Sequence, residues 1–384
     1  MPDKTRHMST PFKRKRFWFA LVLGVLVFLY ALRKADFRVL ARSLEDTDLV
    51  WTFMAIVASG LSYLCIAVVL QYLLKGAGYL LSFSVTARIS TVSSTLNYVL
   101  ATGGLSGVAI KVYLLTRRKI HPSSTLSISM VHGFLTNTVA VVFIYLGFFY
   151  LYSQHKMTVR EMGAGIVILI FALLLTWFTI QTILHESFRR RIWKFCRWFA
   201  SATGARLRHP RWLHLEKADQ FFENFNSSMN YLVGNSRLLL KPAIFALLDW
   251  LLMICCLKFA FLAVHYPIGN RALLVGFSAG IFATLVSVTP ASVGITEGAM
   301  AGSFYLMGLD YEQAFLATVI YRIAYFYLPM LLSFFFYNSL LAASNGQADG
   351  IQAEECQIDQ NPDPAAAESS DLQDKQEKNP PPAK

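Results

Sequence analysis

Ser287–Met300 reads SVTPASVGITEGAM, a polar and helix-breaking segment with long apolar runs on both sides. This position predicts a turn at membrane depth. Backbone groups in hydrocarbon need partners inside the protein, so a turn survives there only where protein buries it or water reaches it. Pro290 and Gly294 predict the break in the helix, and Glu297 places a carboxylate at the next helix start. Intramembrane carboxylates are normally paired or face a wet cavity, so we interpret the segment as a binding site. The alternative is an ordinary loop with Glu297 at the interface.

The composition is that of a polytopic membrane protein. Of 384 residues, 55% are hydrophobic and 15% are charged, which is too apolar for a soluble globular protein. The formal net charge of +12 comes from Lys and Arg residues that gather beside apolar runs. Orientation rules and anionic lipid account for that placement, so we expect no nucleic-acid partner. The five cysteines show no disulfide or metal-ligand spacing, and we expect no metal and no cofactor.

About eight hydrophobic segments follow one another along the chain and predict an all-α membrane fold. They are Phe17–Leu32, Trp51–Leu74, Leu80–Leu115, Ser123–Tyr152, Gly163–Leu184, Leu238–Val264, Leu273–Leu306 and Tyr311–Leu341. We divide the chain into a basic cytoplasmic N-terminus (1–16), a transmembrane domain (17–341) and a disordered polar cytoplasmic tail (342–384). The first segment is expected to remain as a span because no signal-peptide cleavage site follows it.

Leu80–Leu115 is a second interrupted segment. It carries many Ser and Thr residues and Asn97, and it is broken at Thr102–Gly107. Two short helices joined by a glycine turn fit this pattern better than one span. Arg88 precedes the break and Lys111 follows it. Both are candidate ligands for an anionic group. Alternatively, Arg88 extends its charge to the membrane interface and Lys111 flanks a span on the cytoplasmic side.

The segment 185–235 is basic and aromatic. Its first half interleaves Lys and Arg with Trp and Phe, a pattern typical of an amphipathic helix that lies on an anionic leaflet. A solvated cytoplasmic loop that obeys the positive-inside rule is the alternative.

An internal repeat is visible when the chain is shifted by about 187 positions. Thr102 then falls on Thr289 and Gly107 on Gly294, and the second span falls on the span that begins near Leu238. The charge distribution places the two units in opposite orientations. The sequence therefore predicts an inverted repeat in which two broken or re-entrant helical hairpins meet near the membrane midplane.

The motif after the central turn resembles the C-terminal signature of the lysylphosphatidylglycerol synthase transmembrane-region family, the flippase-like half of aminoacyl-phospholipid enzymes. It consists of Pro290-x-x-x-Gly294-x-x-Glu297, then Met307-Gly-Leu309, Ala314 and Arg322. The earlier Gly107-x-x-x-Lys111 is similar to the family's first motif. The resemblance covers most of Phe17–Leu341.

The chain departs from the family pattern at several positions. Ala291 and Ser292 stand where the family usually has glycines, Thr102-Gly-Gly104 lacks a proline, and Lys111 replaces the commoner arginine. These departures bear on the geometry of the turns. The resemblance implies about eight hydrophobic segments and movement of a lipid or lipid-linked molecule across the bilayer, which we expect to be a bacterial inner membrane. The Lys and Arg clusters predict that both termini lie in the cytoplasm.

A lipid flippase-like transporter is the leading hypothesis, with an anionic membrane lipid as partner. The substrate-binding residues would be Glu297, Arg322, Lys111, Gly107, Pro290, Gly294, Asn97 and Arg88. We expect Glu297 to be paired with a cation, either Lys111 or Arg322, because an unpaired charge at this depth would be far more costly.

Two other functions are open. A lipid-modifying enzyme would use Glu297 or Asp249 as general base beside His132, but no nucleophile motif, metal cluster or phosphate loop accompanies them. There is also no room for an aminoacyl-transferase domain, so we expect no enzymatic activity. A membrane scaffold would leave the intramembrane charges without a role.

Overall fold

A computed structural model describes the chain over residues 46–99, 105–153, 159–206, 215–234, 236–287 and 289–345. Within these ranges the regular structure is helical and contains no strand, which confirms the all-α fold. Four predictions fall outside the described residues: the basic N-terminus 1–16, the span Phe17–Leu32, residues 346–384 of the predicted tail, and the tip of the first break at residues 100–104.

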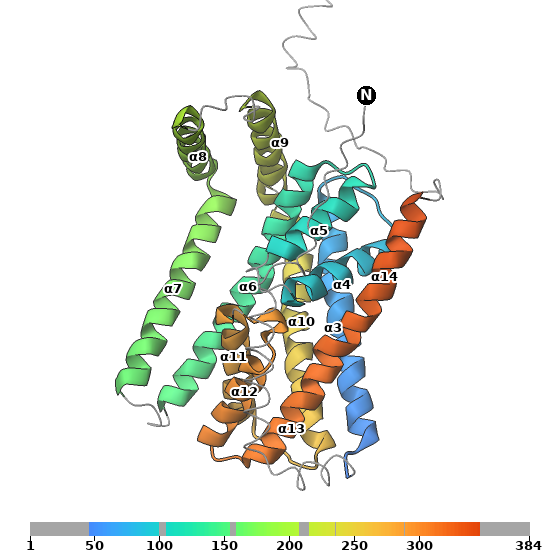
Figure 1. Cartoon of the computed structure of the whole chain (residues 1–384), viewed down its shortest axis with the longest axis vertical. Helices are drawn as coiled ribbons and strands as arrows, with labels where there is room; N and C mark the ends of the chain where they lie inside the picture. Colours follow the sequence, from blue (N-terminus) through green and yellow to red (C-terminus); the bar gives the residue numbers. More distant parts are fainter. Residues whose placement is uncertain are drawn as a thin grey trace, which may run out of the picture.

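The remaining hydrophobic segments form long helices and broken hairpins (Figure 1). Single helices are α3 (Leu49–Gly76), α6 (Pro122–Ser153), α7 (Val159–Leu184) and α10 (Ser236–Ala263). Broken segments are α4 (Phe83–Val99) with α5 (Leu105–Thr116), and α11 (Asn270–Val286) with α12 (Ile295–Leu306). The basic segment forms α8 (Glu186–Arg206) and α9 (Leu215–Gly234), and the last span forms α13 (Tyr311–Arg322), a π turn (Ile323–Tyr327) and α14 (Leu328–Asn345).

The number of helices able to span a membrane is smaller than the number of predicted hydrophobic segments. Among the described residues, four helical runs are long and apolar enough to cross a membrane, namely α3, α6, residues 237–263 of α10, and residues 311–341. Helices α5 and α11 are apolar but short. The two broken hairpins are therefore the part of the fold that departs from simple spans, as predicted.

The helix bounds repeat at the predicted spacing. Adding 187 to the bounds of α3 gives 236–263, the bounds of α10, and adding it to those of α4 gives 270–286, the bounds of α11. The second helices of the hairpins, α5 and α12, have 12 residues each and are offset by three further positions. The unit of span, broken hairpin and span therefore occurs twice.

The two units run in opposite directions. The amide N–H of Asp48, before α3, donates to the carbonyl of Ala263 at the end of α10, at 2.8 Å. At the other end of the pair, Gly76 lies against Leu238. Because α3 and α10 are equivalent helices that pack antiparallel, the repeat is inverted. Figure 1 shows the consequence: the α4–α5 hairpin occupies the half of the molecule near α8 and α9, and α11–α12 the opposite half.

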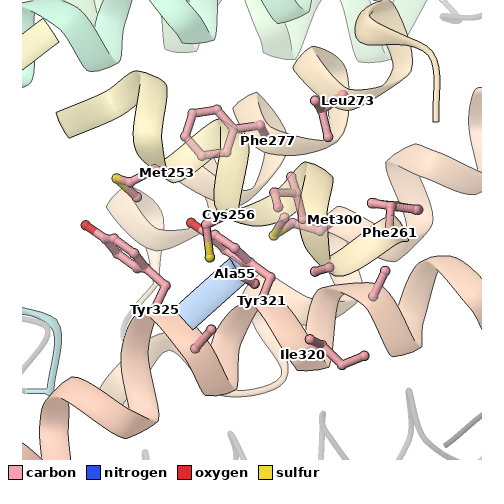
Figure 2. Close-up of a cluster of buried hydrophobic side chains, with 14 of the residues drawn as sticks. Ala55, Met253, Cys256, Phe261, Leu273, Phe277, Met300, Ile320, Tyr321 and Tyr325 are labelled. Carbon is pink, nitrogen blue, oxygen red and sulfur yellow. The ribbon is translucent and has the colours of Figure 1, made fainter. Parts of the chain in front are cut away.

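The interface between the units is built from small and aromatic side chains. Ala55 and Ala58 of α3 and Cys256 and Ala260 of α10 are buried in one cluster. Small residues allow helices to approach closely, which is how helices associate where lipid weakens the hydrophobic driving force. The same cluster extends to Met300 and to residues of α11 and α13, as Figure 2 shows. The second hairpin is thus packed against the repeat interface.

A proline explains the irregular turn between α13 and α14. Pro329 has no N–H, so the carbonyl of Tyr325, four residues earlier, loses its helical partner. The chain widens to a π turn there, and the Tyr63 hydroxyl of α3 donates to that carbonyl at 3.2 Å. π turns of this kind are frequent at functional sites.

Candidate functional site

The central turn is buried and strained. Ser287 ends α11, and its hydroxyl oxygen accepts from the amide N–H of Thr289 at 3.2 Å. Ala291 and Ser292 then adopt left-handed conformations with φ of 59° and 51°, followed by Gly294 at 80°. Left-handed backbone favours glycine. Ala291 and Ser292, which stand where the family usually has glycines, therefore keep the backbone shape that glycines would adopt, at a cost in backbone strain.

Glu297 braces this turn from the next helix. It is 1% exposed, and its Oε2 accepts from the amide N–H of Gly294 at 2.7 Å, as in a capping box. Its Oε1 accepts from Nε of Arg322 in α13 at 2.9 Å. The carboxylate is thus paired inside the protein and does not lie at an interface. Of the two predicted cations, Arg322 is the partner.

Arg322 is fully engaged. Its Nη2 donates to the carbonyl of Ala291 at 2.6 Å, and its Cζ lies 4.7 Å from the ring centroid of Phe326 and 5.8 Å from that of Tyr327. Only 6% of the residue is exposed. The planar guanidinium therefore ties the strained turn and Glu297 to α13 by two hydrogen bonds, and two aromatic rings of the π turn that follows α13 pack against it. Pro290 opens the short 3₁₀ turn that presents the Ala291 carbonyl.

Lys111 occupies a different position from the one that pairing with Glu297 requires. It lies on α5 with 8% exposed, and its Nζ is 3.4 Å from Nδ1 of His132 in α6. Among the described residues it forms no salt bridge. A buried ammonium group with only an imidazole beside it is costly, so Lys111 is not a flanking surface charge.

Asn97 lies between the two helices of the first hairpin. Its Oδ1 is buried and, within the described part of the chain, has no hydrogen-bond partner. Its side chain faces Gly107, which stands one helical turn before Lys111 on the same face of α5. An orphan acceptor and a buried cation therefore lie close together in α4 and α5, and unsatisfied groups of this kind call for an explanation.

Gly107 allows α4 and α5 to come together. A Cβ atom added there would lie 2.7 Å from the backbone oxygen of Ser93 and 3.0 Å from Cβ of Asn97. The backbone of Ser93 cannot move aside as a flexible side chain could. We therefore expect Gly107→Ala to lower the free energy of unfolding by about 1–3 kcal/mol, the usual cost of overpacking. Thermal denaturation in detergent measures this change.

The matched control for Gly107 is Gly133→Ala. Gly133 lies on α6 with no atom within 4 Å of an added Cβ. Alanine is the better helix former by about 1 kcal/mol, so this substitution should stabilise slightly. Equal effects of the two substitutions would show that the helices are not held at the described separation.

The two hairpins meet. Helix α4 contacts the 290–292 turn. The ring of Tyr98, near the end of α4, lies 6.3 Å from the ring of Tyr325 and 6.3 Å from that of Phe326, on which Arg322 stacks. The end of the first hairpin helix is therefore joined to the Glu297–Arg322 pair through aromatic contacts.

Arg88 is separate from these groups. It lies on α4, where its Nη1 donates to the Ser339 hydroxyl of α14 and its Nη2 to the Ser84 hydroxyl, both at 3.0 Å. It lines a cavity of about 480 Å³ between α3, α4 and α14. The structure therefore places the three predicted cations at three positions and does not gather them around one headgroup.

Asp249 is a buried carboxyl group whose partner, Ser62, is not predicted by any local feature of the sequence. It is 3% exposed on α10 and accepts a hydrogen bond from the hydroxyl of Ser62 on α3. These residues are 187 positions apart, which is the repeat spacing. A residue that contacts its own repeat counterpart lies on the pseudo-twofold axis, so the shift that revealed the repeat also pointed to this pair.

The acid–base pairing that a lipid-modifying enzyme would need is not assembled. His132 lies beside Lys111, while Asp249 lies beside Ser62 and Glu297 beside Arg322. The described residues also contain no group of three or more His, Cys, Asp or Glu side chains that could hold a metal ion.

Arg189, in the basic segment, is structural. It is 2% exposed, and its Nε donates to Asn226 Oδ1 of α9 at 2.7 Å. Its Nη1 donates to the carbonyls of Thr182 and Ile183 at 3.1 and 2.7 Å, and its Nη2 donates to Asn230. It fastens the end of α7 to α9 and is therefore unavailable to a lipid headgroup, although its sequence context resembles that of its basic neighbours.

Arg190 and Arg197 of α8 are paired with carboxylates, whereas Arg191 and Lys194 form no salt bridge among the described residues. Arg190 pairs with Glu186 at 2.7 Å and Glu223 at 3.0 Å. Hydrogen bonds from Arg190 and then Asn230 lower the pKa of Glu186 to about 2. Arg191 and Lys194 are exposed. The exposed aromatic residues Phe195, Trp198 and Phe199 accompany them.

Comparison with known proteins gives a consistent result. A family described as "Lysylphosphatidylglycerol synthase TM region" matches residues 17–333. The chain is 24% identical over 315 residues to the UPF0104 membrane protein PH1989 of Pyrococcus horikoshii, covering 81% of this chain and 93% of that protein. It is 28% identical over 117 residues to a UPF0104 membrane protein of Methanothermobacter thermautotrophicus, covering 30% and 33% of the two chains.

Proposed function

We propose a function from the premise that this chain belongs to the lysylphosphatidylglycerol synthase transmembrane-region family, whose match spans residues 17–333: the protein moves an anionic phospholipid or lipid-linked molecule across the bilayer. The observation that carries the proposal is the meeting of two broken hairpins from oppositely oriented repeats, with buried charges in both. Inverted repeats whose broken helices meet inside the membrane are typical of transporters that rock one unit against the other.

Lys111 is the residue we assign to the headgroup. Within the described residues of the two hairpins it is a buried cation that lacks a carboxylate partner, so a phosphate beside it would supply the missing charge. Asn97 and His132 would accept or donate the remaining hydrogen bonds. Arg322 and Glu297 have a different role in this proposal, since their pairing keeps the central turn in its strained conformation.

Reconstituted vesicles test the proposal. Fluorescent phosphatidylglycerol, phosphatidylethanolamine and phosphatidylcholine would be placed in one leaflet, and their movement followed by quenching from outside. We expect the protein to accelerate phosphatidylglycerol most. If no headgroup moves faster than in vesicles that hold an unrelated helical membrane protein, the function is not lipid translocation.

We further propose that the protein resides in the cytoplasmic membrane with both termini and α8 on the cytoplasmic side, and that α8 rests on the anionic leaflet. The clustering of exposed Arg191 and Lys194 with exposed aromatic residues supports this placement. A variant that retains Cys196 of α8 as its single cysteine tests it. We expect a membrane-impermeant thiol reagent to label inside-out vesicles and to leave intact cells unlabelled; the reverse pattern would invert the topology.

A transporter is proposed in preference to an enzyme or a scaffold. The separation of His132 from both Asp249 and Glu297 supports this choice over general-base chemistry. The buried charges of both hairpins support it over a scaffold, which would have no use for them.

A further inference from the structure

The cavity beside Arg88 has the form of a site for one acyl chain. It has a volume of about 480 Å³ and runs between α3, α4 and α14. Its walls are largely apolar and include Ile56 and Leu64 of α3 and Leu328, Leu332 and Phe336 of α14. Ligand pockets in proteins span roughly 300–1,000 Å³ and are lined mainly by hydrophobic residues, so the size and lining are those of a binding site.

The cavity opens sideways. Gly60 lies on its wall and is exposed, and Leu64 and Leu332 are each 45% exposed on its rim. Helix α3 and the helical run 311–341, which contains most of α14, are long and apolar enough to cross a membrane, so we take this side of the molecule to face lipid. A chain of the surrounding bilayer can therefore slide into the cavity without passing through water.

The length of the cavity matches one leaflet. Its wall on α14 runs from Leu328 to Phe336, and Arg88 bonds Ser339 beyond that. Eleven residues separate Leu328 from Ser339, which at 1.5 Å of rise per residue corresponds to about 16 Å. The hydrocarbon core of a bilayer is about 30 Å thick, so each leaflet contributes roughly half of that.

The end of the cavity that Arg88 lines is positively charged. The guanidinium donates to two neutral hydroxyl groups, those of Ser84 and Ser339, and forms no salt bridge within the described residues. Arg118 lies within electrostatic range of it. A guanidinium held by two serines and lacking a carboxylate suits a phosphate group, to which arginine can donate in a bidentate manner.

We infer that the cavity between α3, α4 and α14 binds an anionic glycerophospholipid, with one acyl chain between α3 and α14 and the phosphate on Arg88. This inference rests on the proposed function in that the bound lipid would be the transported molecule at its first docking position. The site lies on the half of the molecule that carries α8, as Figure 1 shows for the start of α4 and the end of α14. The lipid would thus come from the leaflet on that side.

Lipid retention by the purified full chain tests the inference independently of transport. The probes are dioleoylphosphatidylglycerol and dioleoylglycerol, which share acyl chains and differ in the phosphate headgroup, and bound lipid is counted by native mass spectrometry. We expect the wild type to retain the phosphatidylglycerol about tenfold more tightly, the gain from hydrogen bonds to a charged group. Inorganic phosphate alone should not displace it.

Two substitutions separate the chain from the headgroup. Gly60→Trp fills the cavity from a position where an added Cβ meets nothing within 4 Å, and it should lower retention of both probes about tenfold or more. Arg88→Gln should abolish only the preference for phosphatidylglycerol. Gly163→Trp at an exposed position of α7, where an added Cβ likewise meets nothing within 4 Å, is the control and should leave both probes bound.

The results of these lipid-binding and transport experiments can be told apart. Wild-type retention by Gly60→Trp, with unchanged thermal stability, would overturn the acyl-chain site, and an undiminished phosphatidylglycerol preference in Arg88→Gln would overturn the phosphate contact. If both substitutions act as expected and the wild type moves no lipid in vesicles, the binding site stands and the proposed transport is wrong. If transport is observed while Gly60→Trp binds and transports normally, the transport stands without this site.

Discussion

Glu297→Gln should lower the free energy of unfolding by about 3–5 kcal/mol, the usual cost of removing one partner from a buried ion pair. The carboxylate is 1% exposed and accepts from both the Gly294 amide and Arg322 Nε. Glutamine retains one acceptor oxygen, but its NH₂ group would face either a donor amide or the guanidinium. Arg322 would remain buried at 6% exposure without a counter-charge. Thermal or denaturant unfolding in detergent measures the loss.

The consequences of this substitution should be local to the turn. Ala291 and Ser292 are held at positive φ, and Arg322 bonds the Ala291 carbonyl, so loss of the pair releases the strained backbone. Arg322→Lys keeps the charge but cannot bridge Glu297 and Ala291 with a planar fork, and it should destabilise nearly as much. The matched control is Glu216→Gln at an exposed position in the first turn of α9, for which a change within about 0.5 kcal/mol is expected.

A double substitution gives the decisive comparison. Replacing Glu297 and Arg322 together by leucine removes both charges, and apolar replacements of buried pairs are often neutral or stabilising. We therefore expect the double variant to be more stable than Glu297→Gln alone. A double variant that is less stable than either single one would mean that the turn, and not the charge, determines the cost.

Lys111→Met should abolish lipid movement in vesicles, reducing the rate by at least about tenfold, while the folded protein becomes no less stable. The two effects have one cause. Lys111 is 8% exposed, and its polar partner within the described residues is His132 at 3.4 Å, so its charge is costly until an anion binds. Methionine fills similar space without charge.

Paired measurements on one preparation distinguish this expectation from a structural role. The unfolding midpoint should stay the same or rise, and the translocation rate should fall. Lys111→Arg, which restores the family's commoner residue and keeps the charge, should retain transport. If Lys111→Met unfolds early and its residual folded fraction transports normally, Lys111 is a packing residue and the headgroup assignment is wrong.

Much of the architecture follows from the sequence alone. Proline and glycine at residues 290 and 294 mark a helix break because one lacks an N–H and the other tolerates positive φ, and these properties are local. The repeat was readable for a related reason. The spans α3 and α10 obey the same length constraint of the bilayer, and the bounds of α3 and α4 match those of α10 and α11 after a shift of 187.

The role of each basic residue could not be predicted from the sequence. Arg189, Arg190 and Arg191 are consecutive, yet one is buried against α9, one pairs with Glu186, and one is exposed. Their roles follow from the direction in which each side chain leaves the helix and from what packs there, and α9 is supplied by chain some 30 residues further on. Identical residue types therefore received identical predictions.

The sequence by itself determined the class of the protein, the two broken hairpins, the inverted repeat and the need of Glu297 for a cation, since each of these depends on composition, spacing or the local chemistry of one residue. Tertiary structure alone decided that the cation is Arg322 and not Lys111, that Ser62 meets Asp249 on the pseudo-twofold axis, and that Arg88 borders an apolar cavity. These contacts join residues between 25 and 251 positions apart. At such separations the chain's own geometry imposes no proximity, and the packing of helices determines which side chains meet.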